Sequence, residues 1–257
     1  MPSAELYQIV QFIVLELGIP LGLVLLFHFK IGKYPTPLPL SEDKKKEISE
    51  TLVIWAIPVI FLTALIFSSF AERMATPTPE ALGLFILISM VPYIAIPVSY
   101  LVFIKKWTAK DFGFSKPREP AVIIAGVALF AFAGTLPLLN STFTPIPVMM
   151  MLFALYQPAF IEEFFFRGII QGKLERTLGQ NKAWFYAGIL FGLAHFTTNF
   201  FVTGLDLFSG IFMLAGQIIA GWIYGIIYMK TRSLLPGMVC HYLTDGRLAT
   251  IISMMFG

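Results

Sequence analysis

Ionisable side chains interrupt long apolar stretches at three places in the C-terminal half of the sequence. In hydrocarbon such groups are costly unless they are paired or hydrated, so they usually face an interior cavity and mark a functional site. A glutamate beside histidines can take a proton from water, and the same groups can bind a divalent metal. The candidate residues are Glu162, Glu163, Arg167, His195, Asn199, His241 and Asp245.

The first cluster combines two adjacent carboxyl groups with one guanidinium group. Glu163 and Arg167 are four residues apart, so on a helix they share a face and can neutralise one another. Glu162 lies about 100° around the helix and stays outside that pair. This spacing predicts a working Glu162 and a supporting Glu163 held by Arg167. The alternative is a buried ion network that only fixes helix packing.

The second cluster places a histidine on a helix face that carries small residues. Gly188, Gly192, His195 and Asn199 follow one another at spacings of four, three and four, which is one helical stripe. The two glycines would let a neighbouring helix approach closely and aim His195 inward, with Asn199 in support. A histidine that is merely satisfied within the core is the alternative.

The third cluster pairs His241 with Asp245, whose carboxylate can hydrogen-bond the ring and raise its basicity. Together the clusters predict Glu162 as general base, with His195 sharing the proton. His241 and Asp245 would then polarise a carbonyl group. Zinc bound by Glu162, His195 and His241 is the alternative, but the zinc-protease pattern on one helix is absent, so no metal is favoured. Cys240 is expected in the core.

Composition sets the elements that must position these residues. Apolar residues make up 57% of the chain and charged residues 13%, and the mean hydropathy is +0.80. About 20 apolar residues of helix cross a bilayer. We therefore predict an all-α, polytopic integral membrane protein of about eight transmembrane helices, forming a single domain over 1–257 with accessory helices in 6–139 and catalytic core helices in 147–256. The predicted spans are 6–29, 51–70, 81–104, 121–139, 147–171, 183–203, 207–229 and 234–256.

Lysine and arginine orient the predicted bundle. All but three of the 18 lie after the first, third, fifth and seventh predicted helices, and basic residues gather in cytoplasmic loops. Both termini are therefore expected outside the cytoplasm. A rise of 1.5 Å per residue puts Glu162, His195 and His241 at depths of roughly 10 to 18 Å from the cytoplasmic helix ends. These depths predict one water-filled pocket in the cytoplasmic half of the membrane.

The three clusters, in this order and at membrane depth, resemble the CPBP intramembrane proteases, which include CAAX prenyl endopeptidases and bacteriocin-processing or bacteriocin-immunity proteins. The motifs of that family are Glu-Glu-x-x-x-Arg, Phe-x-x-x-His and His-x-x-x-Asn/Asp. Here they read as Glu162, Glu163 and Arg167, then Phe191 and His195, then His241 and Asp245.

The resemblance implies an eight-helix fold in which Glu162 and His195 activate water without a metal. It also implies that His241 and its helix partner complete an oxyanion site. CAAX endopeptidases usually end the third motif with Asn, and an ionised Asp245 cannot donate a hydrogen bond to an oxyanion. Asp245 therefore orients His241, or it is protonated, or the substrate differs from a prenylated CAAX tail.

The expected function is that of an intramembrane endopeptidase cutting near the C-terminus of a membrane-associated substrate, such as a prenylated CAAX tail. Membrane lipid and a membrane protein or lipidated peptide are the expected partners; no nucleic acid and no cofactor are expected, with zinc as the alternative. The protein would lie in the cell membrane of a prokaryote or the endoplasmic reticulum of a eukaryote, its site open toward the cytoplasm. A non-catalytic scaffold, an immunity protein and a proton-coupled transporter are the alternatives.

Overall fold

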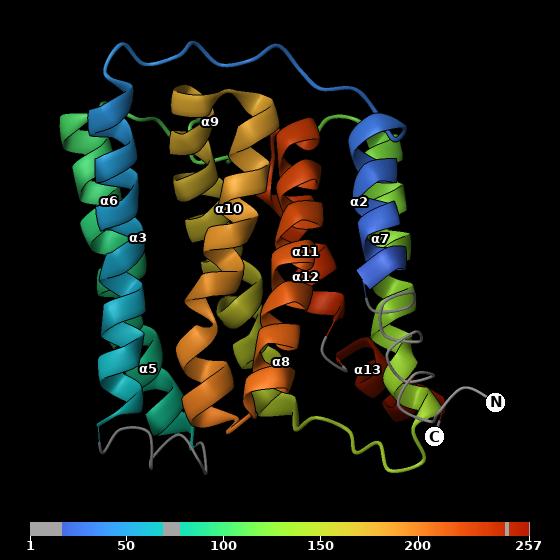
Figure 1. Ribbon diagram of the computed structural model, residues 1–257. Helices are drawn as coiled ribbons and strands as arrows, with labels where there is room; N and C mark the ends of the chain where they lie inside the picture. Colours follow the sequence, from blue (N-terminus) through green and yellow to red (C-terminus); the bar gives the residue numbers. More distant parts are fainter. Residues whose placement is uncertain (1–16, 69–77, 245–246, 257) are drawn as a thin grey trace.

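The computed structural model of the protein describes residues 17–68, 78–244 and 247–256. These residues form a bundle of helices without strands (Figure 1), which confirms the predicted all-α class. Among them, six helical segments are long and apolar enough to cross a membrane. The chain is thus an integral membrane protein, as its composition predicts.

Several of the long segments join α-helical and π-helical turns end to end. The elements are α2 (Ile19–Phe29), α3 (Lys44–Ile66), α5 (Pro79–Met90), η2 (Val91–Ala95), α6 (Ile96–Ser99), η3 (Tyr100–Ile104), α7 (Pro120–Thr135), η4 (Leu136–Leu139), α8 (Val148–Ala154), η5 (Leu155–Phe160), η6 (Glu163–Gln171), α9 (Gly172–Leu178), α10 (Gln180–Ala194), η7 (Thr198–Val202), α11 (Leu207–Thr231), α12 (Leu234–Leu243) and α13 (Arg247–Phe256). The six spans are Lys44–Ile66, Pro79–Ile104, Pro120–Leu139, Val148–Leu178, Gln180–Val202 and Leu207–Thr231.

The predicted second to seventh spans each correspond to one of these six segments. The largest differences are at two boundaries, where α3 begins before residue 51 and α9 continues beyond residue 171. Of the predicted first span, 6–29, the structure describes only the part from residue 17, which contains the short helix α2. The prediction of about eight spans is therefore close to this arrangement without being confirmed by it.

The predicted eighth span, 234–256, is in fact two short helices. α12 and α13 have ten residues each, about 15 Å of helix, which is too short to cross the bilayer core alone. The backbone of Thr244 is extended, with φ −81° and ψ −174°. The Thr244 hydroxyl and the Arg247 guanidinium donate hydrogen bonds to the carbonyl of His241, so side chains satisfy a carbonyl at the point where the helix ends.

Residues that favour helix starts explain several boundaries. The Asp43 carboxylate accepts a hydrogen bond from an N–H in the first turn of α3, and Asp206 does the same for α11. Ser233 caps α12 in the same way. Each side chain satisfies an N–H that has no partner inside its own helix. Two of the three caps lie directly before helices that carry residues of the candidate site.

Most of the basic residues lie in, or within a few residues of, four connectors that lie together at one end of the bundle (Figure 1). They are 30–43, which joins α2 to α3, then 105–119 before α7, and the short turns between α9 and α10 and between α11 and α12. The connector from η4 to α8 lies at the opposite end (Figure 1). The connectors that follow alternate predicted helices and carry or adjoin the basic residues therefore lie at the same end of the bundle.

Helices α10 and α11 pack closely because glycines line their contact. A Cβ atom on Gly188 would clash with the Trp222 indole, and one on Gly192 would clash with Ile218. A Cβ on Gly221 would lie 2.9 Å from the Gly188 Cα. The predicted role of Gly188 and Gly192 in close helix approach is thus confirmed, and it fixes α11 against the helix that ends at His195.

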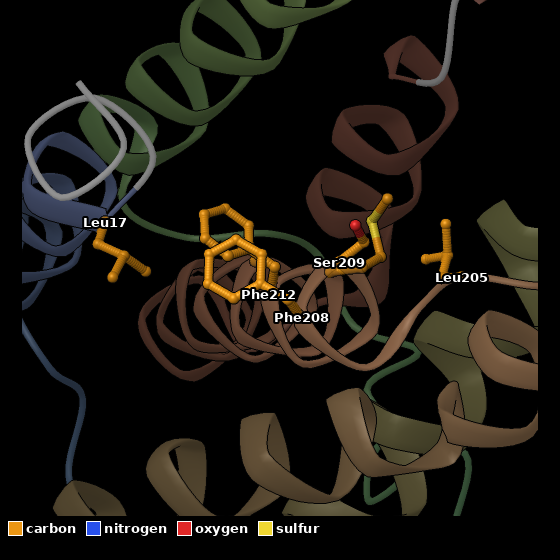
Figure 2. A pocket seen from close by; sticks show the side chains of 7 residues that line it. Leu17, Leu205, Phe208, Ser209 and Phe212 are labelled. Carbon is orange, nitrogen blue, oxygen red and sulfur yellow. The ribbon is translucent and has the colours of Figure 1, made fainter. Parts of the chain in front are cut away.

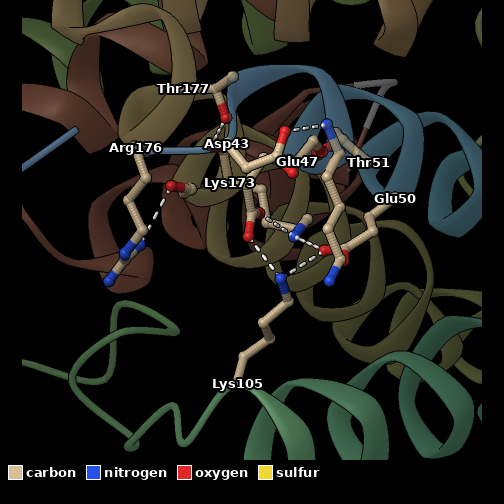
Figure 3. A network of polar contacts seen from close by, with 10 residues as sticks. Asp43, Glu47, Glu50, Thr51, Lys105, Lys173, Arg176 and Thr177 are labelled. Atoms are coloured by element: carbon tan, nitrogen blue, oxygen red, sulfur yellow. Dashed lines mark hydrogen bonds and ion pairs between the residues drawn. The ribbon is translucent and has the colours of Figure 1, made fainter. Parts of the chain in front are cut away.

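An ion network joins the accessory helices to the core at the basic end of the bundle (Figure 3). The Lys173 ammonium group on α9 contacts Glu47 on α3 and lies 3.0 Å from Glu50. Lys105 lies 2.5 Å from Glu47 and 2.8 Å from Glu50. The Lys173 side chain is only 1% exposed, so its charge depends on these carboxylates for compensation.

We expect Lys173→Met to destabilise the protein by about 3 kcal/mol, because two partly buried carboxylates would then share a single cation. Thermal unfolding in detergent, followed by circular dichroism, measures the effect as a lower midpoint. Lys116→Met is the control, since Lys116 is exposed. Equal midpoints for the two variants would show that the network does not hold α3 to α9.

Candidate active site

Glu162 follows a break in the long segment Val148–Leu178. Gln157, within η5, has non-helical torsions of φ −121° and ψ 115°, directly before Pro158, which has no N–H to donate to the helix. The Gln157 amide donates a 2.7 Å hydrogen bond to Oε1 of Glu162. The second oxygen, Oε2, is buried and has no hydrogen-bond partner within the described residues. One carboxylate oxygen is therefore held by Gln157, and the other can still accept a hydrogen bond or a proton.

His195 lies at the C-terminal cap of α10, and its ring orientation is fixed by a backbone carbonyl. Nδ1 is 2.8 Å from the carbonyl oxygen of Phe191. Because a carbonyl can only accept, Nδ1 carries the proton of this hydrogen bond. Nε2 then faces Glu162, at 3.9 Å from Oε2. The side chain is 24% exposed, and its ring packs on that of Phe191.

His241 lies between the two glutamates. Its Nδ1 donates to Oε1 of Glu163 over 3.2 Å, and its Nε2 is 3.8 Å from Oε2 of Glu162. The ring stacks on Tyr224 of α11, with centroids 4.8 Å apart. Glu163 thus holds the far nitrogen of the ring. No spacing within one helix indicates this contact, because the two residues lie on different helices.

The predicted pair of Glu163 and Arg167 is confirmed. Nε of Arg167 is 3.4 Å from Oε2 of Glu163, and both side chains are fully buried. The guanidinium carbon also lies over the rings of Phe191, at 4.6 Å, and Tyr224, at 5.3 Å. Aromatic faces attract a cation, so Arg167 is enclosed by one carboxylate and two rings, and Glu162 remains outside the pair as predicted.

One cavity of about 300 Å³ brings the three predicted working residues together. It lies within the bundle between segments that are far apart in the sequence. Its lining residues are Phe130, Pro158, Glu162, Phe191, His195, Gln217, Ala220, Tyr224, His241 and Thr244. Glu162, His195 and His241 thus converge on one space, as their depths along the helices predict, whereas Glu163 and Arg167 lie outside its wall.

The remaining candidates have different positions. Asn199 is 4% exposed and pairs with Gln217 of α11, which itself lines the cavity. Sequence reasoning missed Gln217, although an amide in an apolar membrane helix is a signal of the kind that identified the histidines. Asp245 lies outside the described residues. Cys240 is 1% exposed and belongs to the core, as expected.

A second pocket, of about 370 Å³, lies beside the N-terminal half of α11 (Figure 2). Its lining residues are Leu17, Leu205, Phe208, Ser209, Phe212, Met213 and Gly216. None of them is ionisable, and the rings of Phe208 and Phe212 lie 5.5 Å apart. Gly216 lines the apolar pocket and Gln217 lines the candidate cavity, so the two spaces are neighbours along α11.

Residues 144–246 match the family model described as type II CAAX prenyl endopeptidase, Rce1-like. This segment is similar to Rce1-like domains. It runs from just before α8 to just after α12 and so contains every charged and imidazole group of the cavity, which confirms the resemblance to CPBP proteases. The accessory helices α2 to α7 precede it. No curated protein and no solved structure matches the chain.

The donor atoms around the cavity are relevant to the zinc alternative. Within the described residues, no group of three or more His, Cys, Asp and Glu side chains is arranged to hold a metal ion. The Nε2 atoms of His195 and His241 lie 3.9 and 3.8 Å from Oε2 of Glu162. Activity without a metal stays a prediction.

Gly237→Ala is expected to reduce any peptide hydrolysis by the protein about 10-fold or more. The new Cβ would lie 2.5 Å from Oε2 of Glu163, and displacing that carboxylate misaligns His241. Initial rates of the purified variant measure the loss, and circular dichroism reports whether it remains folded. Gly83→Ala is the control, since a Cβ there meets nothing within 4 Å. Full activity of Gly237→Ala would contradict a positioning role for Glu163.

Proposed function

We propose that the protein is an intramembrane endopeptidase in which Glu162 activates a water molecule. One observation carries this proposal: the unpaired oxygen of Glu162 faces the Nε2 atoms of His195 and His241 across one cavity inside a membrane bundle. A carboxylate in such a site can accept a proton from water, and an adjacent imidazole can pass the proton on. The Rce1-like match supports a protease by family.

The proposed reaction consumes one water molecule and yields a carboxylic acid and an amine. Glu162 Oε2 takes a proton while the water oxygen attacks the carbonyl carbon, and the π electrons of the carbonyl move onto its oxygen. When the tetrahedral species collapses, the C–N bond breaks and the leaving nitrogen receives the proton from Glu162, directly or through His195. The His241 ring stabilises the negative charge that develops on the carbonyl oxygen. The Glu163 carboxylate holds this ring at its other nitrogen.

The surroundings of the two glutamates favour the same assignment. Glu163 is compensated by Arg167, whereas Oε2 of Glu162 faces two imidazoles. A carboxylate and imidazoles that face one another can pass a proton among them without a metal ion. We therefore propose a glutamate mechanism rather than a zinc mechanism.

We further propose that the substrate is a peptide bearing an apolar group near its C-terminus, with a prenylated CAAX tail as the best-supported class. The family description supports a prenyl endopeptidase. The pocket lined by Phe208, Phe212 and Gly216 offers an apolar surface directly along α11 from the catalytic cavity. The basic connectors at one end of the bundle favour access from the cytoplasmic side.

Glu162→Gln should lower the rate of peptide cleavage at least about 100-fold, because an amide of the same shape cannot accept the proton. Quenched fluorescent peptides with farnesylated CAAX tails, added to protein purified in detergent, measure the rate. Glu42→Gln is the matched control, since Glu42 is exposed and precedes α3.

The same assay, repeated with a strong zinc chelator, separates the two mechanisms. Activity that depends on Glu162 and survives chelation supports the glutamate mechanism, whereas activity lost on chelation and restored by zinc would replace it with a metal mechanism. Cleavage undiminished in Glu162→Gln would overturn the proposal. A wild-type protein that cleaves none of the peptides would favour a scaffold.

Gly216→Leu should raise KM for a farnesylated peptide about 10-fold and leave KM for the unmodified peptide unchanged. A Cβ at Gly216 meets nothing within 4 Å, so a leucine side chain can extend into the apolar pocket and take the place of a ligand there. Gly22→Leu on α2 is the control, because that position is equally open and does not line the pocket. Equal KM shifts for the two peptides would exclude this pocket as the site of the prenyl group.

A further inference from the structure

Attack on a carbonyl group places negative charge on its oxygen, and the cavity must supply a donor for that charge. One fixed donor is commonly worth about 10²–10³ in rate. Glu162 is the proposed base, and Nε2 of His241 faces Glu162. The hydroxyl of Thr244 donates to the carbonyl of His241. Among the described residues that line the cavity, Gln217 alone has an amide group.

Gln217 is held by a reciprocal pair of amide hydrogen bonds. Nδ2 of Asn199 donates to Oε1 of Gln217 over 2.9 Å, and Nε2 of Gln217 donates to Oδ1 of Asn199 over 3.3 Å. A primary amide has two N–H donors, and such a pair uses one of them. The second N–H of Gln217 has no acceptor within the described residues. The Gln217 amide is thus held at the wall of the cavity, and its second N–H is available to a ligand.

Asn199 is in turn anchored to the segment that carries His195. Its backbone N–H donates to the carbonyl of His195 over 2.9 Å, and its own carbonyl accepts from Leu205. Its side chain is nearly fully buried. A movement of Asn199 therefore requires a movement of the His195 turn, so the amide pair and the imidazole keep a constant relation to one another.

The contact between α10 and α11 fixes Gln217, the other member of the amide pair. Ile218 packs against the bare backbone of Gly192, and Trp222 packs against Gly188. Gln217 is adjacent to Ile218, so the glycine contact sets both the rotation and the height of the Gln217 side chain relative to His195. An oxyanion donor must be held in place before the reaction begins, and this packing provides that constraint.

We infer that Gln217 is a further catalytic residue, which donates its free N–H to the carbonyl oxygen of the scissile peptide bond, and that Asn199 is its positioning residue. The inference rests on the proposed function and adds to it a donor on α11. In this role the amide forms no covalent bond and transfers no proton. It stabilises the oxygen as negative charge develops there.

The test compares Gln217→Glu and Gln217→Leu with wild type on a farnesylated peptide, in detergent. Glutamate keeps the shape and the acceptor for Asn199 but replaces the N–H group by oxygen. We expect kcat to fall about 100-fold with KM changed less than about threefold, because the bond forms only as charge develops. A phosphinate analogue of the peptide, which mimics the tetrahedral species, should bind about 100-fold more weakly to Gln217→Leu, and the product peptide should bind equally.

Asn199 is tested by a conservative and a non-conservative variant. Asn199→Asp keeps an acceptor for Nε2 of Gln217 and should retain more of kcat than Asn199→Leu. Thr63→Val is the matched control: it removes a 3.0 Å hydrogen bond to Thr197, on the same turn as Asn199, and neither threonine lines the cavity. Thermal midpoints show whether each variant remains folded.

The outcomes separate this inference from the proposed function. Wild-type cleavage that depends on Glu162, together with full kcat in both Gln217 variants, would overturn the role of Gln217 alone. A parallel loss of phosphinate and product binding in Gln217→Leu would reduce Gln217 to a structural residue. Absence of any cleavage by wild type would count against the proposed function, and the inference would fall with it.

Discussion

The ion pair of Glu163 and Arg167 is the interaction on which the candidate site depends. Both side chains are fully buried, and in a low-dielectric interior a charge left without compensation costs several kcal/mol. The surrounding elements therefore stabilise both charges of the pair. Phe191 and Tyr224 present their ring faces to Arg167, and His241 donates to the other oxygen of Glu163. Three further segments, α10, α11 and α12, are thus tied to η6 by one charge pair.

The positions of Glu162, His195 and His241 also follow from interruptions of their helices. Glu162 comes shortly after the break at Gln157, His195 caps α10, and His241 precedes the extended residue Thr244. In lipid, an interrupted helix is tolerated where it is buried in protein or lines a polar cavity. The π-helical element η6, directly after Glu162, is a further irregularity of the kind found at functional sites. Irregular backbone therefore lies next to each of the three side chains that point into the cavity.

Much of this arrangement was predictable from single-helix patterns. Hydropathy located the long segments, and spacing identified the Glu163–Arg167 pair and the glycine face of α10, because each depends on residues within one helix. The features that the sequence did not predict depend on contacts between helices or on side chains at helix ends. Glu163 supports His241 across two elements, and no spacing encodes that contact. The break at Thr244 was missed because 234–256 is apolar enough for one helix, and hydropathy cannot register side chains that satisfy its terminal carbonyls.

The two histidines are chemically distinct although each presents Nε2 to the same oxygen of Glu162. Behind His195 lies the carbonyl of Phe191, a neutral acceptor that fixes the ring without compensating a positive charge. Behind His241 lies the carboxylate of Glu163, which does both. Positive charge that develops during a reaction is therefore better accommodated on His241, which is also the more deeply buried of the two. His195, the more exposed of the two rings, is better placed to exchange a proton with water. The carboxylate of the buried charge pair thereby gives the two histidines different electrostatic surroundings.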